Sequence, residues 1–140
     1  SKSDVGCELP FIKPMEVGGR ECFVRGRMDA VISGNPPRVI DYKYAPWREG
    51  AESDYEVQMA AYCLAVMMRS SSERAVAELW FLKGSLRIVQ QEFLRADAER
   101  LIAGLLEGYL QSLSSGFWPM AERSYCDSVA CGFREQCWVK

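Results

Sequence analysis

The stretch Val39-Ile40-Asp41-Tyr42-Lys43 has the composition of a short β-strand. Side chains two positions apart in a strand point to the same face, so Asp41 and Lys43 are predicted to lie side by side. A charged pair on a strand that otherwise resembles a buried one is costly unless the two groups pair or bind something. A structural salt bridge and a functional site are both compatible with this pattern.

Regular elements are predicted on both sides of this strand. In chain order they are strands over 8–17, 21–33 and 38–44, a helix over 55–69 with Asp54 as N-cap, strands over 75–83 and 86–93, and a helix over 96–114 closed by Gly116. The Gly18-Gly19 pair between the first two strands is typical of a hairpin turn. The order β-β-β-α-β-β-α predicts one α/β domain over residues 1–140, with a cysteine-containing tail over 117–140.

The composition restricts the chemistry. The 140 residues include no histidine, which excludes within this chain a Ser-His-Asp or Cys-His nucleophile, a Cys2His2 zinc finger and an HExxH metalloprotease. The net charge of −2 does not by itself indicate a nucleic-acid binder. Neither a signal peptide nor an apolar run of about 18 residues is present, and we expect a reducing, cytoplasmic location. Because the first residue is Ser1, we expect a fragment of a longer chain.

A second carboxylate, that of Asp29, precedes the Asp41–Lys43 pair in the sequence. Asp29 lies in an otherwise apolar stretch one hairpin before Asp41, and neighbouring antiparallel strands bring facing side chains within about 5 Å. Two carboxylates at that separation repel unless a cation lies between them, and Mg²⁺ prefers such oxygen ligands. With Lys43 to neutralise charge on a phosphate, the set suits phosphodiester hydrolysis. Glu8 either reaches the same metal or is an exposed residue at a strand end.

The first predicted helix carries a polar pair. Gln58 and Tyr62 are four residues apart and therefore share one helix face, which Tyr55 also roughly shares. The pair is either the polar edge of an amphipathic helix or part of the same site.

Four segments in this order resemble the PD-(D/E)xK nuclease superfamily, and within it the RecB-like nuclease domain at the end of bacterial helicase–nuclease subunits such as RecB and AddA. Its motifs are Glu-x-x-Phe, G-x-x-D, hydrophobic-D-x-K and Q-x-x-x-Y. The matching segments are Glu8–Phe11, Gly26–Asp29, Val39–Lys43 and Gln58–Tyr62.

The resemblance implies a restriction-endonuclease-like fold with a mixed central sheet flanked by helices. It implies an Mg²⁺- or Mn²⁺-dependent deoxyribonuclease of exonuclease type, acting in DNA recombination and repair in the bacterial cytoplasm. Its partners would be single-stranded DNA ends and a helicase domain in the same chain or complex, and no membrane. A catalytically impaired DNA-binding or scaffolding module is the alternative, and a cysteine-based redox or structural module is a third hypothesis.

The resemblance also assigns roles to residues. Asp29 and Asp41 would bind the metal, with the Tyr42 backbone carbonyl as a further ligand. Lys43 would be the catalytic lysine. Gln58 and Tyr62 would contact DNA or support the site. The family's further His or Glu ligand on an upstream helix would precede Ser1, or Glu8 would take its place.

Three cysteines crowd the tail. Cys126-x4-Cys131-x5-Cys137 resembles the C-terminal cluster of RecB-like nucleases that holds a [4Fe-4S] centre, although the first gap is two residues longer than usual. Thiolates also bind zinc, and a remnant cluster without metal, or with some cysteines paired, is a third possibility. Cys7 is a candidate fourth ligand, or that ligand precedes Ser1.

Basic and aromatic side chains are candidate DNA contacts. Arg25, Arg27 and Arg48 are candidates for DNA phosphate contacts. Trp47, in the loop after Lys43, either stacks on a base or caps the core.

Overall fold

The computed structural model describes residues 4–128 and 130–138, so residues 129, 139 and 140 of the predicted tail lie outside the described part. The elements are β1 (Val5–Val17), β2 (Arg20–Ile32), β3 (Arg38–Lys43), a short 3₁₀ helix (Ala51–Tyr55), α1 (Glu56–Ser70), β4 (Arg74–Phe81), β5 (Arg87–Leu94), α2 (Arg95–Ser115), α3 (Arg123–Ser128) and α4 (Arg134–Cys137). The predicted order β-β-β-α-β-β-α is confirmed, with α3 and α4 added in the tail.

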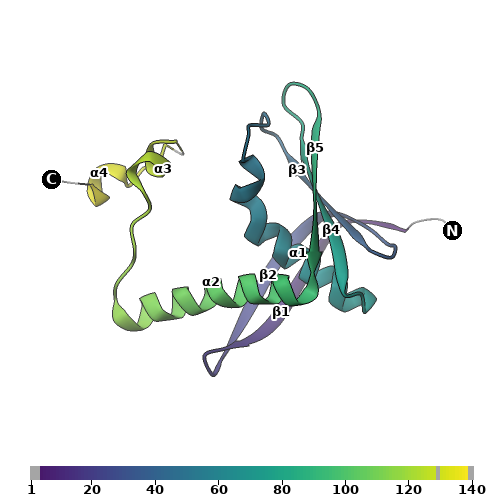
Figure 1. The fold of residues 1–140 in the computed structure, drawn as a ribbon, viewed down its shortest axis with the longest axis horizontal. Helices are drawn as coiled ribbons and strands as arrows, with labels where there is room; N and C mark the ends of the chain where they lie inside the picture. Colours follow the sequence, from purple (N-terminus) through teal and green to yellow (C-terminus); the bar gives the residue numbers. More distant parts are fainter. Residues whose placement is uncertain (1–3, 129, 139–140) are drawn as a thin grey trace. The chain divides into compact units, whose positions relative to one another are not determined.

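The five strands form one mixed sheet in the order β1-β2-β3-β4-β5 (Figure 1). The pairs β1–β2, β2–β3 and β4–β5 are antiparallel, whereas β3 and β4 are parallel. A parallel pair needs a crossover connection, and α1 supplies it. Gly18 and Gly19 have φ of 58° and 71°, the left-handed values that a two-residue hairpin turn requires.

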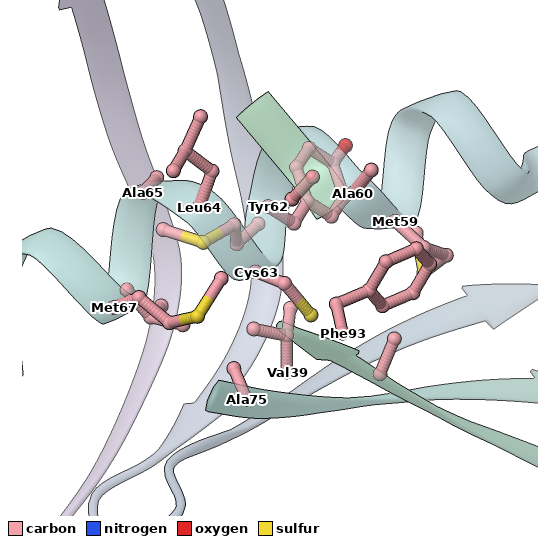
Figure 2. Packing of buried hydrophobic residues seen from close by; sticks show 14 of the residues in the cluster. Val39, Met59, Ala60, Tyr62, Cys63, Leu64, Ala65, Met67, Ala75 and Phe93 are labelled. Carbon is pink, nitrogen blue, oxygen red and sulfur yellow. The ribbon is translucent and has the colours of Figure 1, made fainter. Parts of the chain in front are cut away.

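The core lies between α1 and the sheet. Met59, Cys63 and Met67 follow one another at four-residue spacing and are buried, so they form the helix stripe that faces the strands. Figure 2 shows Cys63 directly above Val39 of β3 and Met59 beside Phe93 of β5. The apolar period of α1 therefore fixes which helix face is presented to the strand that carries the Asp-x-Lys pair.

The predicted N-cap of α1 is wrong. Asp54 lies within the 3₁₀ helix that leads into α1, and Tyr55 occupies the N-cap position without a side-chain capping bond. The Asp54 carboxylate instead pairs with the guanidinium of Arg48. Because the chain is already helical at Asp54, its side chain is not placed to receive the N–H groups of the first turn.

By their internal contacts, residues 1–107 and 108–140 form two compact units. In the second unit, Gly116 has φ 71° directly after α2, as its predicted role at the helix end requires. Arg134 of α4 bonds Asp127 of α3 and its neighbour Glu135, which links these two short helices. Along the described parts of the chain, no helix is long and apolar enough to cross a membrane.

Burial separates the cysteines by reactivity. Cys63 is buried in the core, and desolvation of its thiolate raises the pKa of this thiol to about 12. At pH 8 only about one molecule in ten thousand then carries the reactive thiolate. Iodoacetamide is therefore expected to modify the exposed Cys7 and Cys137 of the native protein and to leave Cys63 intact. Peptide mass mapping measures this, with guanidinium-unfolded protein as the control in which Cys63 reacts. Native labelling of Cys63 as fast as Cys7 would contradict the packing.

Candidate functional site

The centre of the candidate site is the ion pair predicted on β3. The Lys43 Nζ lies 2.6 Å from Asp41 Oδ2, and the two side chains are 16% and 4% exposed. This oxygen is buried, and the ammonium is its close charged neighbour. The pair is therefore held by charge attraction in a desolvated position, where electrostatic interactions are stronger than at the surface.

Side chains of α1 hold this pair in place. Lys43 Nζ donates to Gln58 Oε1 at 3.0 Å, and Gln58 Nε2 lies 3.4 Å from Asp41 Oδ1. The same Nε2 donates to the Tyr62 hydroxyl at 2.8 Å. The predicted helix face therefore contacts the predicted strand face, and Gln58 bridges both members of the ion pair.

Tyr55 is an additional contact of the lysine. Its ring centroid lies 4.1 Å from Lys43 Nζ, a cation–π distance. The sequence contained a signal for this contact, since Tyr55 precedes Gln58 by three residues and shares its helix face. The spacing alone did not predict that the Tyr55 ring would lie over the Lys43 ammonium. The ammonium is thus fixed by a carboxylate, an amide oxygen and an aromatic face.

Asp29 reaches β3 from β2. Its Oδ2 accepts a hydrogen bond of 2.8 Å from the backbone N–H of Tyr42, between the two members of the ion pair. The β1–β2 ladder pairs Cys7 with Ala30 and Leu9 with Met28 but skips the position between them, where Glu8 lies opposite Asp29 with φ 53°. The break in the β1–β2 pairing thus occurs at Glu8, one of the candidate metal ligands, directly opposite Asp29.

The electrostatics of Asp41 reflect this arrangement. Burial raises the pKa of the Asp41 carboxyl above its ordinary value, Lys43 opposes this rise, and the negative charge of Asp29 adds to it. The two carboxylates are therefore close enough to repel each other. A cation bound between them would relieve this repulsion.

Aromatic packing joins three of the four sequence motifs. Phe11 of β1 and Tyr62 of α1 meet edge to face, with ring centroids 5.7 Å apart. Gly26 of β2 lies beneath them, and a Cβ there would come within 2.8 Å of the Phe11 ring and 3.4 Å of the Tyr62 ring. Because Gly26 has no side chain, it leaves room for the Tyr62 ring. Tyr62 is the residue whose hydroxyl accepts the Gln58 hydrogen bond.

The structure does not bring the other candidate ligands and contacts to this site. Glu8 forms an exposed ion pair with Arg27, with 3.2 Å between Oε2 and Nη1, and Arg48 pairs with Asp54. Arg25 is exposed on β2. The DNA-binding role of the three arginines therefore stays a prediction. Glu8 has no contact that would support its predicted role as a metal ligand.

The tail cysteines are free thiols of differing burial: Cys126 is buried, Cys131 half-buried and Cys137 exposed. The Cys131 backbone N–H donates to the Cys126 carbonyl at 3.0 Å, so these two are neighbours in a turn. Across residues 4–128 and 130–138, no three His, Cys, Asp or Glu side chains are grouped as for a metal ion. A metal cluster in the tail remains a prediction.

The carboxylates of β2 and β3 fit a hard divalent cation. Asp29 and Asp41 offer oxygen ligands on neighbouring strands, and the buried Asp41 Oδ2 has the Lys43 ammonium 2.6 Å away. Mg²⁺ is usually bound through one or two carboxylates and completes its octahedral shell with water and substrate phosphate oxygens. Two carboxylates are therefore enough for such a site.

Comparison with known proteins agrees with this geometry. A family model described as the PD-(D/E)XK nuclease superfamily matches residues 2–138. The crystal structure of SSO0001 is similar, with a TM-score of 0.57 and 24% sequence identity. The match covers 91% of this chain but only 60% of that chain, so the chain spans less than two thirds of the solved structure. No curated protein matches the chain.

These similarities confirm the predicted fold class, a restriction-endonuclease-like α/β fold whose mixed five-stranded sheet is flanked by helices. At 24% identity the SSO0001 structure supports the fold alone. The family match reaches the superfamily and does not distinguish a RecB/AddA-like branch.

The close contact at Gly26 predicts a specific stability loss. Gly26→Ala is expected to destabilise the protein by about 1–3 kcal/mol, because the new methyl group displaces the Phe11 ring from Tyr62. Urea denaturation followed by circular dichroism measures this change. The control is Gly104→Ala in α2, where a Cβ meets nothing within 4 Å and a gain of about 0.5–1 kcal/mol is expected. Equal stability of Gly26→Ala and the wild type would contradict the packing argument.

Proposed function

Because this chain belongs to the PD-(D/E)XK nuclease superfamily, we propose that it is a divalent-metal-dependent deoxyribonuclease that hydrolyses phosphodiester bonds. One observation carries the proposal: a desolvated Asp41–Lys43 ion pair is bridged by Gln58 and lies beside Asp29. A buried ion pair of this kind is weak support for stability, since its desolvation cost offsets its attraction. A site in which the carboxylate would bind a metal ion and the ammonium would face a substrate phosphate explains the arrangement better.

In this proposal Asp29, Asp41 and the Tyr42 backbone carbonyl would hold Mg²⁺ or Mn²⁺. The bound ion would lower the pKa of a water molecule and stabilise negative charge on the phosphate. Lys43 contributes a positive charge fixed by Gln58 and Tyr55, which neutralises charge that develops on the phosphate oxygens. The preorganised position of this ammonium avoids reorganisation during the reaction.

The finer proposal concerns substrate and context. We place the chain among RecB/AddA-like nucleases because the four motifs follow that order, which implies exonuclease action on single-stranded DNA ends delivered by a helicase domain in the same chain or complex. Recombination and repair in the bacterial cytoplasm are the corresponding role. The tail with Cys126, Cys131 and Cys137 would carry a [4Fe-4S] or zinc centre, and residues 1–140 would act as one nuclease domain.

A second candidate is a catalytically impaired nuclease-like module that binds or positions DNA. One observation favours it: Glu8, the candidate replacement for the family's further His or Glu ligand, pairs with Arg27. Cleavage by the wild-type chain would exclude this alternative.

Substitutions on β3 test the proposal. Asp41→Asn and Lys43→Ala are each expected to lower metal-dependent DNA cleavage at least about 100-fold, because one removes a metal ligand and the other the positive charge facing the phosphate. The measurement is release of acid-soluble nucleotides from single- and double-stranded DNA with Mg²⁺, Mn²⁺ or EDTA. The matched controls are Glu21→Gln, exposed on β2, and Lys13→Ala, half-buried on β1, and both should cleave normally.

The outcomes separate the two candidates. Cleavage that requires the metal and disappears in both β3 variants supports the nuclease. Folded wild-type protein that binds DNA but cleaves neither substrate with either metal would falsify it and support the impaired module.

Gln58 is proposed as a positioning residue. Gln58→Ala removes the amide that joins Lys43, Asp41 and Tyr62, so a roughly 10–100-fold loss of kcat is expected with little change in KM. Its pH–rate profile should also shift, because the Asp41–Lys43 pair loses the group that orients it. Gln58→Glu keeps an acceptor for Lys43 but adds a negative charge, and should shift the profile differently. A uniform loss of activity with an unchanged profile would indicate a merely structural role.

A further inference from the structure

A second cation lies on the same sheet face as the catalytic lysine. The register of the sheet places Lys43 of β3 opposite Phe81 of β4, and Phe81 opposite Arg87 of β5. Side chains directly opposite each other point to the same face, so these three form one row across the sheet. Two strand spacings of about 4.8 Å put the backbone of Arg87 on the order of 10 Å from that of Lys43.

An exposed indole holds this arginine. The Arg87 guanidinium carbon lies 4.9 Å from the centroid of the Trp47 ring, a cation–π contact between β5 and the loop that follows Lys43. Trp47 is 39% exposed and is therefore not a buried core residue. An aromatic ring and a guanidinium are therefore both open to solvent beside the active centre.

The loop that carries Trp47 is fastened to the sheet. The Lys43 carbonyl accepts from the Leu82 N–H at 2.9 Å, and the Ala45 carbonyl accepts from the Lys83 N–H at 3.3 Å. These bonds continue the β3–β4 pairing beyond the strand ends, so the loop leaves the sheet in a defined direction. Trp47 thus has a fixed position relative to Lys43.

The charges of this region differ from those of the predicted arginine set. Arg48 is neutralised by Asp54, whereas Arg87 contacts the uncharged Trp47 ring. A guanidinium stacked on a ring keeps its in-plane N–H donors for a phosphate, which it can bind through two parallel hydrogen bonds. The indole adds a flat apolar surface of the kind on which unpaired bases stack.

We propose that Trp47 and Arg87 form a binding subsite for one unpaired nucleotide of DNA next to the phosphate that is cleaved, an assignment that rests on the proposed nuclease function. Trp47 stacks on the base and Arg87 binds the adjoining phosphate. A base inside a duplex is stacked on its neighbours and cannot use the ring, so the subsite favours a single strand over a duplex.

Binding measurements without turnover test the subsite. Fluorescence anisotropy in EDTA compares a labelled single-stranded oligonucleotide, a duplex of the same length and a single strand of the same length made of abasic nucleotides. Trp47→Ala is expected to weaken binding of the normal single strand about 10-fold and to leave duplex and abasic binding unchanged. Arg87→Ala is expected to weaken normal and abasic strands alike and to reduce the slope of log K against log salt by about 0.7.

Conservative variants and remote controls separate binding from folding. Trp47→Phe keeps a stacking ring and Arg87→Lys keeps the charge, so each should retain more affinity than the corresponding alanine variant. Phe23→Ala and Arg20→Ala, exposed positions of β2, are the matched controls and should bind like the wild type. Thermal unfolding monitors the fold of every variant.

Several outcomes would overturn the subsite. It fails if both alanine variants fold and bind the single strand like the wild type, or if Trp47→Ala weakens duplex and abasic binding as much as single-strand binding. Failure of the nuclease proposal has another signature: no metal-dependent cleavage by the wild type while the single-strand dependence on Trp47 persists. Cleavage with unchanged binding in both alanine variants would retain the nuclease and reject the subsite.

Discussion

The arrangement of the site depends on the desolvated ion pair between Asp41 and Lys43. Burial raises the pKa of Asp41, and the charge of Asp29 raises it further, so this carboxylate requires the lysine beside it. The lysine in turn is held by Gln58 and by the ring of Tyr55. Removal of either charge would leave the other in a site that water reaches poorly. This constraint explains why the strand and α1 must meet in one register.

The rest of the fold maintains that register. The aromatic contact of Phe11 with Tyr62 lies over Gly26, and the Tyr62 hydroxyl receives the Gln58 hydrogen bond. One continuous set of contacts thus runs from β1 through α1 to the ion pair. Three motifs that are separate in the sequence are in this way parts of a single packed unit, whose Phe11 and Tyr62 belong to the core.

Local patterns predicted much of this. The element order followed from alternation, helical periodicity and glycine turns. Spacings of two and four indicated which residues of β3 and of the α1 region share a face, whereas their site roles were implied by the family resemblance. The Asp54 cap was wrong because a 3₁₀ helix precedes α1. The ladder irregularity at Glu8 and Asp29 was not foreseeable either, since nothing in a glutamate signals a left-handed backbone.

Residue spacing alone indicates which side chains share a face: Asp41 with Lys43 on a strand, and Tyr55, Gln58 and Tyr62 on a helix. These relations depend only on the period of each element, so they can be inferred before the fold is known. Which faces meet depends instead on strand register, on the direction of the loop after Lys43 and on the contacts of residues far apart in the chain. Glu8 therefore forms an ion pair with Arg27, and Trp47 forms a cation–π contact with Arg87, forty residues further along the chain.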